Sequence, residues 1–82
     1  MKQKILIVDD EPDVVDLLEF NLRGAGFEVA TAENGSKALK KVRNSIPDLI
    51  LLDLMLPEID GLELCKLLRR DPQTSDIPII ML

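Results

Sequence analysis

The sequence predicts an α/β domain built on a parallel β-sheet. Two short runs, residues 5–8 and 49–52, are entirely aliphatic, which is typical of strands buried on both faces. The segments between the candidate strands place apolar residues at helical spacing. This alternation predicts the order βαβαβαβ, in which right-handed crossovers join parallel strands.

The first half of the chain supplies two strands and a helix. Residues 12–25 form an amphipathic segment, in which Pro12 suits the first helical turn and Gly24 or Gly26 suits the end. Its apolar stripe consists of Val15, Leu18, Leu22 and Ala25. Residues 27–31 alternate between apolar and polar, which predicts a second strand nearer an edge of the sheet.

Two further helices follow. Residues 34–36 (Asn-Gly-Ser) form a turn or cap, and the next helix carries its apolar stripe at residues 38, 39 and 42 before Pro47 stops it. Residues 60–63 resemble a capping box, with the Asp60 carboxylate in place of a hydroxyl, and open a third helix that runs to Arg70. Residues 71–75 form a turn, and residues 77–82 form the last apolar strand.

Composition excludes several functions. The 82 residues suffice for one small domain, and a formal charge of −5 argues against a nucleic-acid-binding surface on this segment. No apolar run exceeds four residues, so we expect no membrane span, and the N-terminus does not resemble a secretory signal. The absence of histidine excludes His-ligated metals, and a lone Cys65 fits a reducing, cytoplasmic compartment.

Three aspartates mark the candidate site. Asp9 and Asp10 end the first strand and Asp53 ends the third. Ligands of open parallel sheets bind at the carboxyl ends of strands, so the three carboxylates converge if these two strands are neighbours. Oxygen ligands of this kind suit Mg²⁺, with a backbone carbonyl and waters completing the coordination.

The motifs around these aspartates resemble a known family. Ile5-Leu-Ile-Val-Asp-Asp-Glu-Pro12 is similar to the opening of the receiver domain of bacterial two-component response regulators. The segment from Asp48 to Gly61 is similar to its phosphoacceptor region, with Pro four residues and Gly eight residues after Asp53. The similarity covers the whole chain and is greatest to OmpR/PhoB-type receivers. It implies a flavodoxin-like (CheY-like) fold with helices on both faces and strand order 2-1-3-4.

The resemblance also implies a role for each site residue. Asp53 is the expected phosphoacceptor, which takes a phosphoryl group from a phosphohistidine of a sensor histidine kinase. Asp10 binds Mg²⁺ directly, Asp9 helps to place the ion through water, and the backbone carbonyl of Met55 completes the protein ligands. Pro57 shapes the loop, and Gly61 lets the third helix begin close to Asp53. The domain is thus a regulatory switch with a transcriptional output, and not an enzyme.

One expectation concerns the extent of the domain. Residues 1–82 correspond to the N-terminal portion of a single receiver domain, without the fifth strand, the last helices, or the hydroxyl and lysine residues that sense the phosphoryl group. An alternative is therefore a truncated or engineered fragment that folds or self-associates, as a homodimer or by domain swapping, without complete switching. The apolar edge at residues 77–82 favours self-association.

Other interpretations remain open from the residues alone. Asp9 and Asp10 could cap the first helix, and Asp53 could be a solvated residue at a strand end. A dinucleotide-binding fold would need a glycine-rich loop where residues 9–12 read Asp-Asp-Glu-Pro. A haloacid-dehalogenase-type phosphatase would need its first two aspartates separated by one residue, and a flavin protein would need aromatic residues or a phosphate loop. We interpret the basic side chains at positions 37, 40, 41 and 43 as a solvated helix face.

Overall fold

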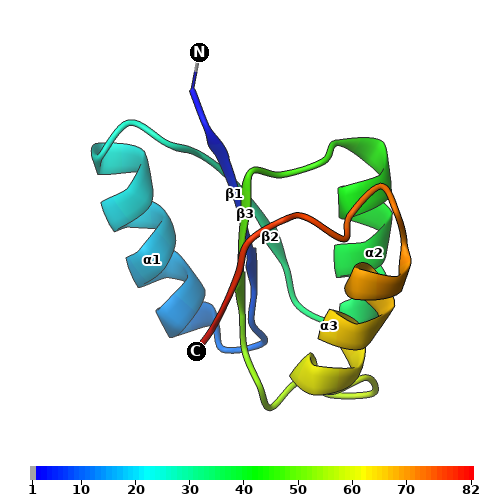
Figure 1. Ribbon diagram of the computed structural model, residues 1–82. Coiled ribbons are helices and arrows are strands. Elements are labelled where there is room, and N and C mark those ends of the chain that lie inside the picture. Colours follow the sequence, from blue (N-terminus) through cyan, green and yellow to red (C-terminus); the bar gives the residue numbers. More distant parts are fainter. Residues whose placement is uncertain (1) are drawn as a thin grey trace.

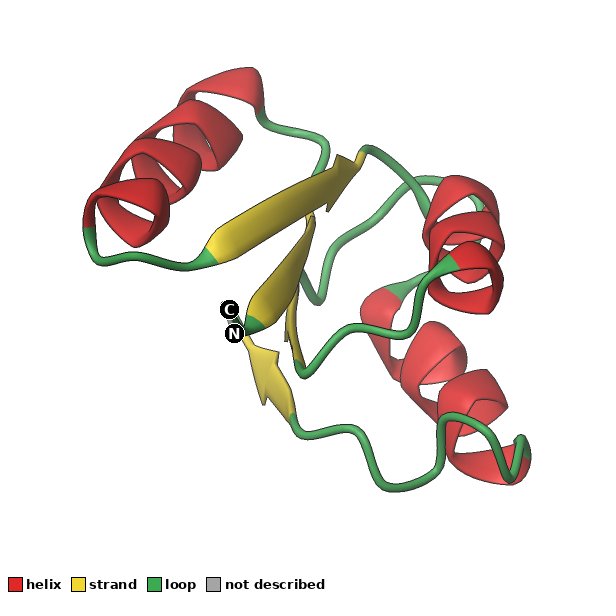
Figure 2. Ribbon diagram, turned by 90° about the horizontal axis from the view of Figure 1, so that it is seen from above, coloured by secondary structure: helices red, strands yellow, loops and turns green. Residues whose placement is uncertain are grey.

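The fold is a four-stranded parallel sheet covered by helices on both faces. The computed structural model describes residues 2–82. The strands are β1 (Lys4–Val8), β2 (Glu28–Ala32), β3 (Leu49–Leu52) and β4 (Ile79–Met81), in the order β2-β1-β3-β4. Helix α1 (Pro12–Gly24) covers one face, and α2 (Gly35–Asn44) and α3 (Gly61–Arg70) cover the other (Figures 1 and 2). The predicted fold class and strand order are confirmed.

Alternating residues of the central strands build two separate cores. On the face below α2 and α3, Leu6, Val8 and Leu52 are at most 1% exposed and contact the helices. On the α1 face, Ile5 and Ile7 pack with Val15, Leu18 and Leu22 of the helix. The aliphatic runs of β1 and β3 are therefore buried on both sides, which explains why these segments carry no polar residue.

Two strand boundaries differ from those predicted. The second strand, predicted at residues 27–31, lies one residue later, because Lys4 pairs with Glu28 and the N–H of Phe27 bonds instead to the carbonyl of Leu22. The last strand, predicted at residues 77–82, is reduced to Ile79–Met81. Residue 77 still belongs to the preceding turn, because its N–H bonds to the carbonyl of Thr74.

Helices α2 and α3 each begin at a residue whose side chain accepts a hydrogen bond from a backbone N–H group of the first turn. The Asn34 side chain accepts from the N–H of Lys37 at 2.8 Å, and the Asp60 carboxylate accepts from the N–H of Glu63 at 2.9 Å. These bonds satisfy donors that a helix leaves free in its first turn. The two helices therefore begin at fixed positions, both beside the loop that follows β3.

Residues 2–82 contain no helix with the length and apolar character that a membrane crossing requires.

Candidate metal centre

The sheet itself brings the first and third strands' carboxyl ends together. β1 and β3 are parallel neighbours, and Val8 pairs with Leu52 (Figure 1). The hydrogen bonding continues one residue beyond the ends of β1 and β3. The N–H of Asp53 donates to the carbonyl of Val8 at 2.9 Å, and the N–H of Asp9 donates to the carbonyl of Ala32 in β2 at 3.1 Å. Asp9 and Asp53 therefore lie at the same level of the sheet.

The three predicted carboxylates form one cluster. One carboxylate oxygen from each of Asp9, Asp10 and Asp53 lies within 4.8 Å of the other two. Asp9 is buried, Asp53 is half-buried and Asp10 is exposed, so the cluster opens toward solvent on one side. A small cation could reach such a cluster and contact all three groups.

The environment of Asp9 disfavours its negative charge. Burial raises the pKa of the Asp9 carboxyl, and the nearby Asp53 and Asp10 carboxylates raise it further, while the backbone N–H of Glu11 opposes the shift. That N–H donates to Asp9 Oδ1 at 2.9 Å. A divalent cation would relieve both the repulsion and the poor solvation, and an all-oxygen donor set suits Mg²⁺.

Capping of the first helix does not account for the Asp9–Asp10 pair. The residue at the N-cap of α1 is Glu11, and no side chain caps this helix. Asp9 accepts from the N–H of the cap residue itself, and not from the first turn of the helix. The acidic pair therefore belongs to the cluster and does not cap the helix. Helix α1 begins at Pro12, which lacks an N–H and needs no acceptor.

The loop after β3 folds back on the phosphoacceptor candidate. Asp53 Oδ1 accepts a hydrogen bond from the N–H of Met55 at 3.0 Å, so the backbone of the following loop holds this carboxylate in place. The Met55 side chain is 78% exposed and points away from the core. Its backbone carbonyl remains a predicted ligand that rests on the family resemblance.

A tight turn in this loop was not predicted. The N–H of Ile59 bonds to the carbonyl of Pro57 at 2.8 Å, and Glu58 between them has φ of 68°. This is a three-residue turn that places a non-glycine residue in the left-handed region, at a cost of order 1 kcal/mol. Neither Gly nor Asn stands at position 58, so the sequence carried no signal for the positive φ.

Gly61 lies against the backbone of the site. A Cβ added at this position would lie 2.4 Å from the carbonyl oxygen of Asp53 and 2.8 Å from Cα of Leu54. The Gly61 N–H also bonds to the carbonyl of Leu54 at 3.0 Å. Helix α3 can start this close to Asp53 only because residue 61 has no side chain.

A hollow next to the cluster adds two acidic residues that the sequence did not single out. It has a volume of about 210 Å³, and both Asp16 of α1 and Glu33 after β2 line it together with Asp9 and Asp10. Asp16 lies one helical turn after Pro12, and Glu33 follows the second strand, so only the tertiary fold brings them to the site. The Asp16 carboxylate adds to the negative potential that attracts a cation, whereas the Glu33 carboxylate is paired with Lys37.

Comparison with known proteins identifies a family. The profile described as the response regulator receiver domain matches residues 5–82. The alkaline phosphatase synthesis transcriptional regulatory protein PhoP of Bacillus subtilis is 52% identical over 82 residues, which are 100% of this chain and 33% of that protein. The DNA-binding response regulator MtrA of Mycolicibacterium smegmatis is 50% identical over 100% of this chain and 35% of its own length. The chain thus spans about a third of the length of these relatives.

Solved structures show the same architecture. The N-terminal domain of a response regulator receiver protein from Methanoculleus marisnigri superposes with a TM-score of 0.92 at 40% identity, covering 95% of this chain and 63% of that one. The chemotaxis protein CheY4 of Vibrio cholerae superposes with a TM-score of 0.94 at 34% identity, covering 99% of this chain and 68% of that one.

Proposed function

The chain belongs to the receiver domain family of response regulators, and we propose that it is the phosphoacceptor part of a two-component signalling switch. The observation that carries the proposal is the convergence of three carboxylates from two neighbouring strand ends. In this proposal Asp53 accepts a phosphoryl group from a sensor histidine kinase. PhoP is named as a transcriptional regulatory protein and MtrA as a DNA-binding response regulator, which supports a transcriptional output for the full-length protein.

The chain's own groups would perform the transfer in a simple way. One Asp53 carboxylate oxygen forms a bond to phosphorus, while the bond between phosphorus and the kinase histidine breaks and the imidazole leaves. The N–H of Met55, which donates to Asp53 Oδ1 at 3.0 Å, orients the carboxylate so that its other oxygen is free to attack. Glycine at position 61 keeps the neighbouring backbone in this place.

The residues present fit Mg²⁺. Asp10 and Asp53 would hold the ion, Asp9 would place it through water, and the Met55 carbonyl would complete the protein ligands. When bound, the ion supplies positive charge that offsets the carboxylates and the phosphoryl oxygens. The raised pKa of Asp9 supports this assignment, because the cluster has more negative charge than its surroundings can solvate.

The test separates metal binding from phosphorylation. Mg²⁺ is titrated into the chain, into Asp10→Asn and into Asp76→Asn, whose carboxylate is exposed and lies outside the cluster. Acetyl phosphate is then added, and intact mass with hydroxylamine treatment detects an acyl phosphate. We expect a hydroxylamine-labile phosphoryl group on Asp53, lost in Asp53→Asn and Asp10→Asn and kept in Asp76→Asn. Phosphorylation of another residue would contradict the role of Asp53.

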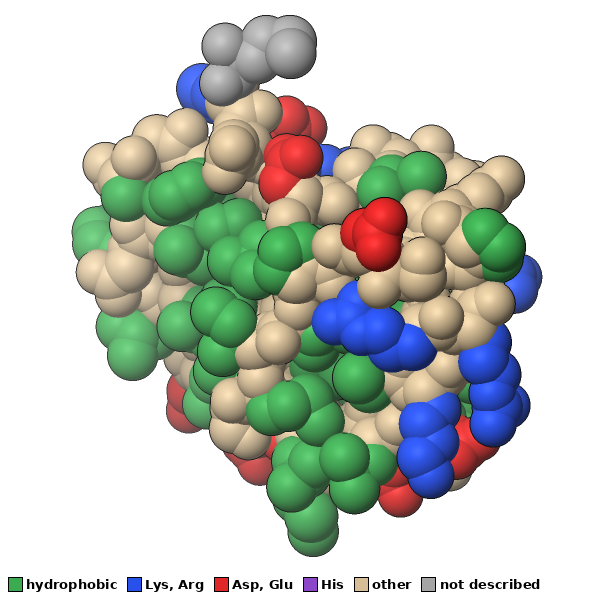
Figure 3. Space-filling view, in the orientation of Figure 1, with side chains coloured by type: hydrophobic (Ala, Val, Ile, Leu, Met, Phe, Trp, Pro, Cys, Tyr) green, Lys and Arg blue, Asp and Glu red, His purple; other side chains and the backbone are tan. Residues whose placement is uncertain are grey.

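A second candidate function is self-association of this chain. One observation favours it: β4 lies at the edge of the described sheet, and Ile80 and Leu82 are 51% and 49% exposed. Ile80 pairs with Leu51, a core residue of the α1 face, so it extends an apolar surface that α1 continues (Figure 3). An unpaired strand edge beside such a surface favours pairing with a second chain.

Sedimentation across micromolar concentrations tests this second function. We expect concentration-dependent dimers, which Ile80→Lys converts to monomers. Ile46→Lys is the matched control, because Ile46 is equally exposed at 51% but lies after α2, outside β4. A compact monomer at all concentrations, or an equal effect of the two substitutions, would exclude pairing through β4.

A further inference from the structure

Two apolar side chains anchor the loop between β3 and α3. Leu56 is 8% exposed and belongs to the core on the face below α2 and α3, and the half-buried Ile59 packs against the same core. Met55 and Glu58, on either side of Leu56, are exposed. The path of this loop, which begins at Asp53, therefore depends on where these two anchors lie.

Ile59 lies directly beside the place where Gly35 lacks a side chain. A Cβ added at Gly35 would lie 3.2 Å from Cβ of Ile59, 3.6 Å from its Cδ1 and 3.7 Å from its Cγ2. Gly35 is buried and is the first residue of α2, whose start is fixed by the hydrogen bond from the N–H of Lys37 to the Asn34 side chain. The contact therefore joins the loop to a helix start that is itself held in place.

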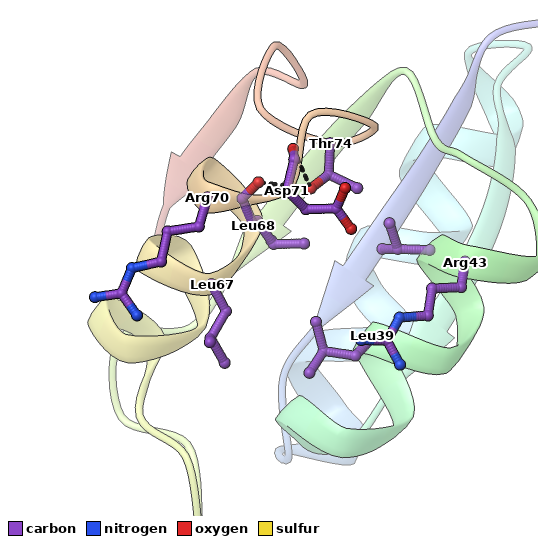
Figure 4. Close-up of a pocket in the computed structure, with 8 residues that line it drawn as sticks. Leu39, Arg43, Leu67, Leu68, Arg70, Asp71 and Thr74 are labelled. Atoms are coloured by element: carbon purple, nitrogen blue, oxygen red, sulfur yellow. Dashed lines mark hydrogen bonds between the residues drawn. The ribbon is translucent and has the colours of Figure 1, made fainter.

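The later turns of α2 and α3 do not provide the same link, because a groove separates them (Figure 4). Its volume is about 240 Å³, and Leu39 and Val42 of α2 line it together with Leu67 and Leu68 of α3. The contact with Ile59 lies at the other end of α2, where both helices begin beside the carboxyl ends of the strands (Figure 1). This contact therefore ties the loop to α2 at the end where the site lies.

The same contact constrains a strained turn. Glu58, the residue before Ile59, has φ of 68°, and the N–H of Ile59 bonds to the carbonyl of Pro57 at 2.8 Å. A non-glycine residue keeps such a backbone conformation only where its surroundings fix it. The packing of Ile59 against Gly35 fixes one side of this turn, so its loss would let the turn relax.

Two hydrogen bonds connect the turn with the site. The N–H of Gly61 bonds to the carbonyl of Leu54 at 3.0 Å and closes the loop. Within the closed loop, the N–H of Met55 donates to Asp53 Oδ1 at 3.0 Å. A shift of Ile59 would therefore move the backbone that carries this donor.

We propose that Ile59 is a positioning residue, which orients the Asp53 carboxylate through its contact with Gly35. Ile59 acts through the loop and the N–H of Met55, and not on the phosphoryl group itself. Its effect on phosphorylation rests on the proposed function, whereas its effect on the Asp53 hydrogen bond does not. A misplacement of about 1 Å can slow a reaction about 100-fold, so the smaller shifts expected here should slow phosphorylation less.

Two substitutions disturb the contact from opposite sides. Ile59→Ala removes the side chain beyond Cβ, and Gly35→Ala adds a Cβ so close to Ile59 that this residue must shift by a few tenths of an ångström. Ile59→Val is the conservative variant, because it keeps Cβ and Cγ2 beside Gly35. The matched control is Leu22→Ala, which truncates another half-buried side chain, near the end of α1 and in the core of the opposite face.

Amide NMR spectra recorded without Mg²⁺ report the Asp53 hydrogen bond directly. This bond shifts the amide proton of Met55 downfield, and a longer or bent bond shifts it less. We expect the Met55 resonance to move upfield in Ile59→Ala and Gly35→Ala. It should keep its position in Ile59→Val and in Leu22→Ala, because neither substitution displaces the loop.

The rate of phosphorylation by acetyl phosphate at saturating Mg²⁺ is the second measurement. We expect the rate to fall about tenfold in Ile59→Ala and about threefold in Gly35→Ala. Ile59→Val and Leu22→Ala should stay within about twofold of the wild type, although urea unfolding should show a stability loss in Leu22→Ala similar to that in Ile59→Ala. The double variant Gly35→Ala/Ile59→Ala should lose less than the product of the two single effects, because both act through one contact.

The outcomes separate this inference from the proposed function. An unmoved Met55 resonance in Ile59→Ala and Gly35→Ala, or an equal rate loss in Ile59→Ala and Leu22→Ala, would overturn the inference. So would independent, multiplicative effects in the double variant. Should Ile59→Ala fail to fold, Gly35→Ala tests the same contact, because alanine is favoured over glycine in a helix. A Met55 resonance that moves as expected in a chain that accepts no phosphoryl group would support the positioning role and contradict the proposed function.

Discussion

Replacing Gly61 with alanine should distort the backbone that carries Asp53. An added Cβ would lie 2.4 Å from the Asp53 carbonyl oxygen and 2.8 Å from Cα of Leu54, well inside van der Waals contact. Both atoms belong to the backbone, so no side chain can rotate away. Either the loop or the start of α3 must move, and overpacking of this kind typically costs about 1–3 kcal/mol.

Helix propensity offsets part of this cost. Alanine is favoured over glycine in a helix by up to about 1 kcal/mol, although less at a terminal position such as residue 61. We therefore expect Gly61→Ala to lower the free energy of unfolding by roughly 1–2 kcal/mol. In a domain of this size a loss of 1 kcal/mol lowers Tm by about 4–8 °C.

Urea unfolding followed by circular dichroism measures the loss, and Mg²⁺ titration measures its effect on the site. The matched control is Gly24→Ala, because a Cβ at position 24 meets no atom within 4 Å. We expect the control to leave stability unchanged or slightly higher. Mg²⁺ affinity should fall in Gly61→Ala alone, since only this substitution displaces Asp53. Equal stability and equal Mg²⁺ affinity of the two variants would refute the close-approach argument.

Three further substitutions test other parts of the structure. Asp9→Asn should stabilise the metal-free chain by on the order of 1 kcal/mol near pH 7, because it removes one of three mutually repelling carboxylates and keeps an oxygen for the Glu11 N–H. The pKa of Asp9 is higher in the folded chain than in the unfolded chain, so the free energy of unfolding of the wild type should fall as the pH rises between these two values. Urea titrations at several pH values should show a smaller fall for Asp9→Asn. Identical pH profiles for the two proteins would contradict the raised pKa. Asp60→Ala should lower the free energy of unfolding, measured by chemical denaturation, by about 1 kcal/mol, because the α3 cap is lost. Asp76→Ala changes an exposed turn position and should leave the free energy of unfolding unchanged. Leu64→Ala should lower the free energy of unfolding by about 2–5 kcal/mol, because residue 64 is fully buried. Leu62→Ala is the control, because residue 62 is 57% exposed. Similar thermal midpoints for the two variants would contradict the assigned core.

The sequence determined the order and type of the elements. The aliphatic runs at residues 5–8 and 49–52 predicted strands buried on both faces, and Pro12, Asn34 and Asp60 marked the helix starts through local chemistry. Such signals depend on neighbours a few residues apart, so they can be read along the chain. The acidic pair and Asp53 were recognisable for the same reason, since each directly follows a strand.

Only the tertiary structure decided how distant residues meet. The distance between Asp9 and Asp53 depends on strands 1 and 3 being neighbours, and the positive φ of Glu58 depends on the loop closing against α3. Asp16 and Glu33 join the acidic hollow because helices pack on a sheet at angles that local sequence does not encode. Burial, and with it the raised pKa of Asp9, is likewise a property of the packed chain, because it depends on which atoms exclude water.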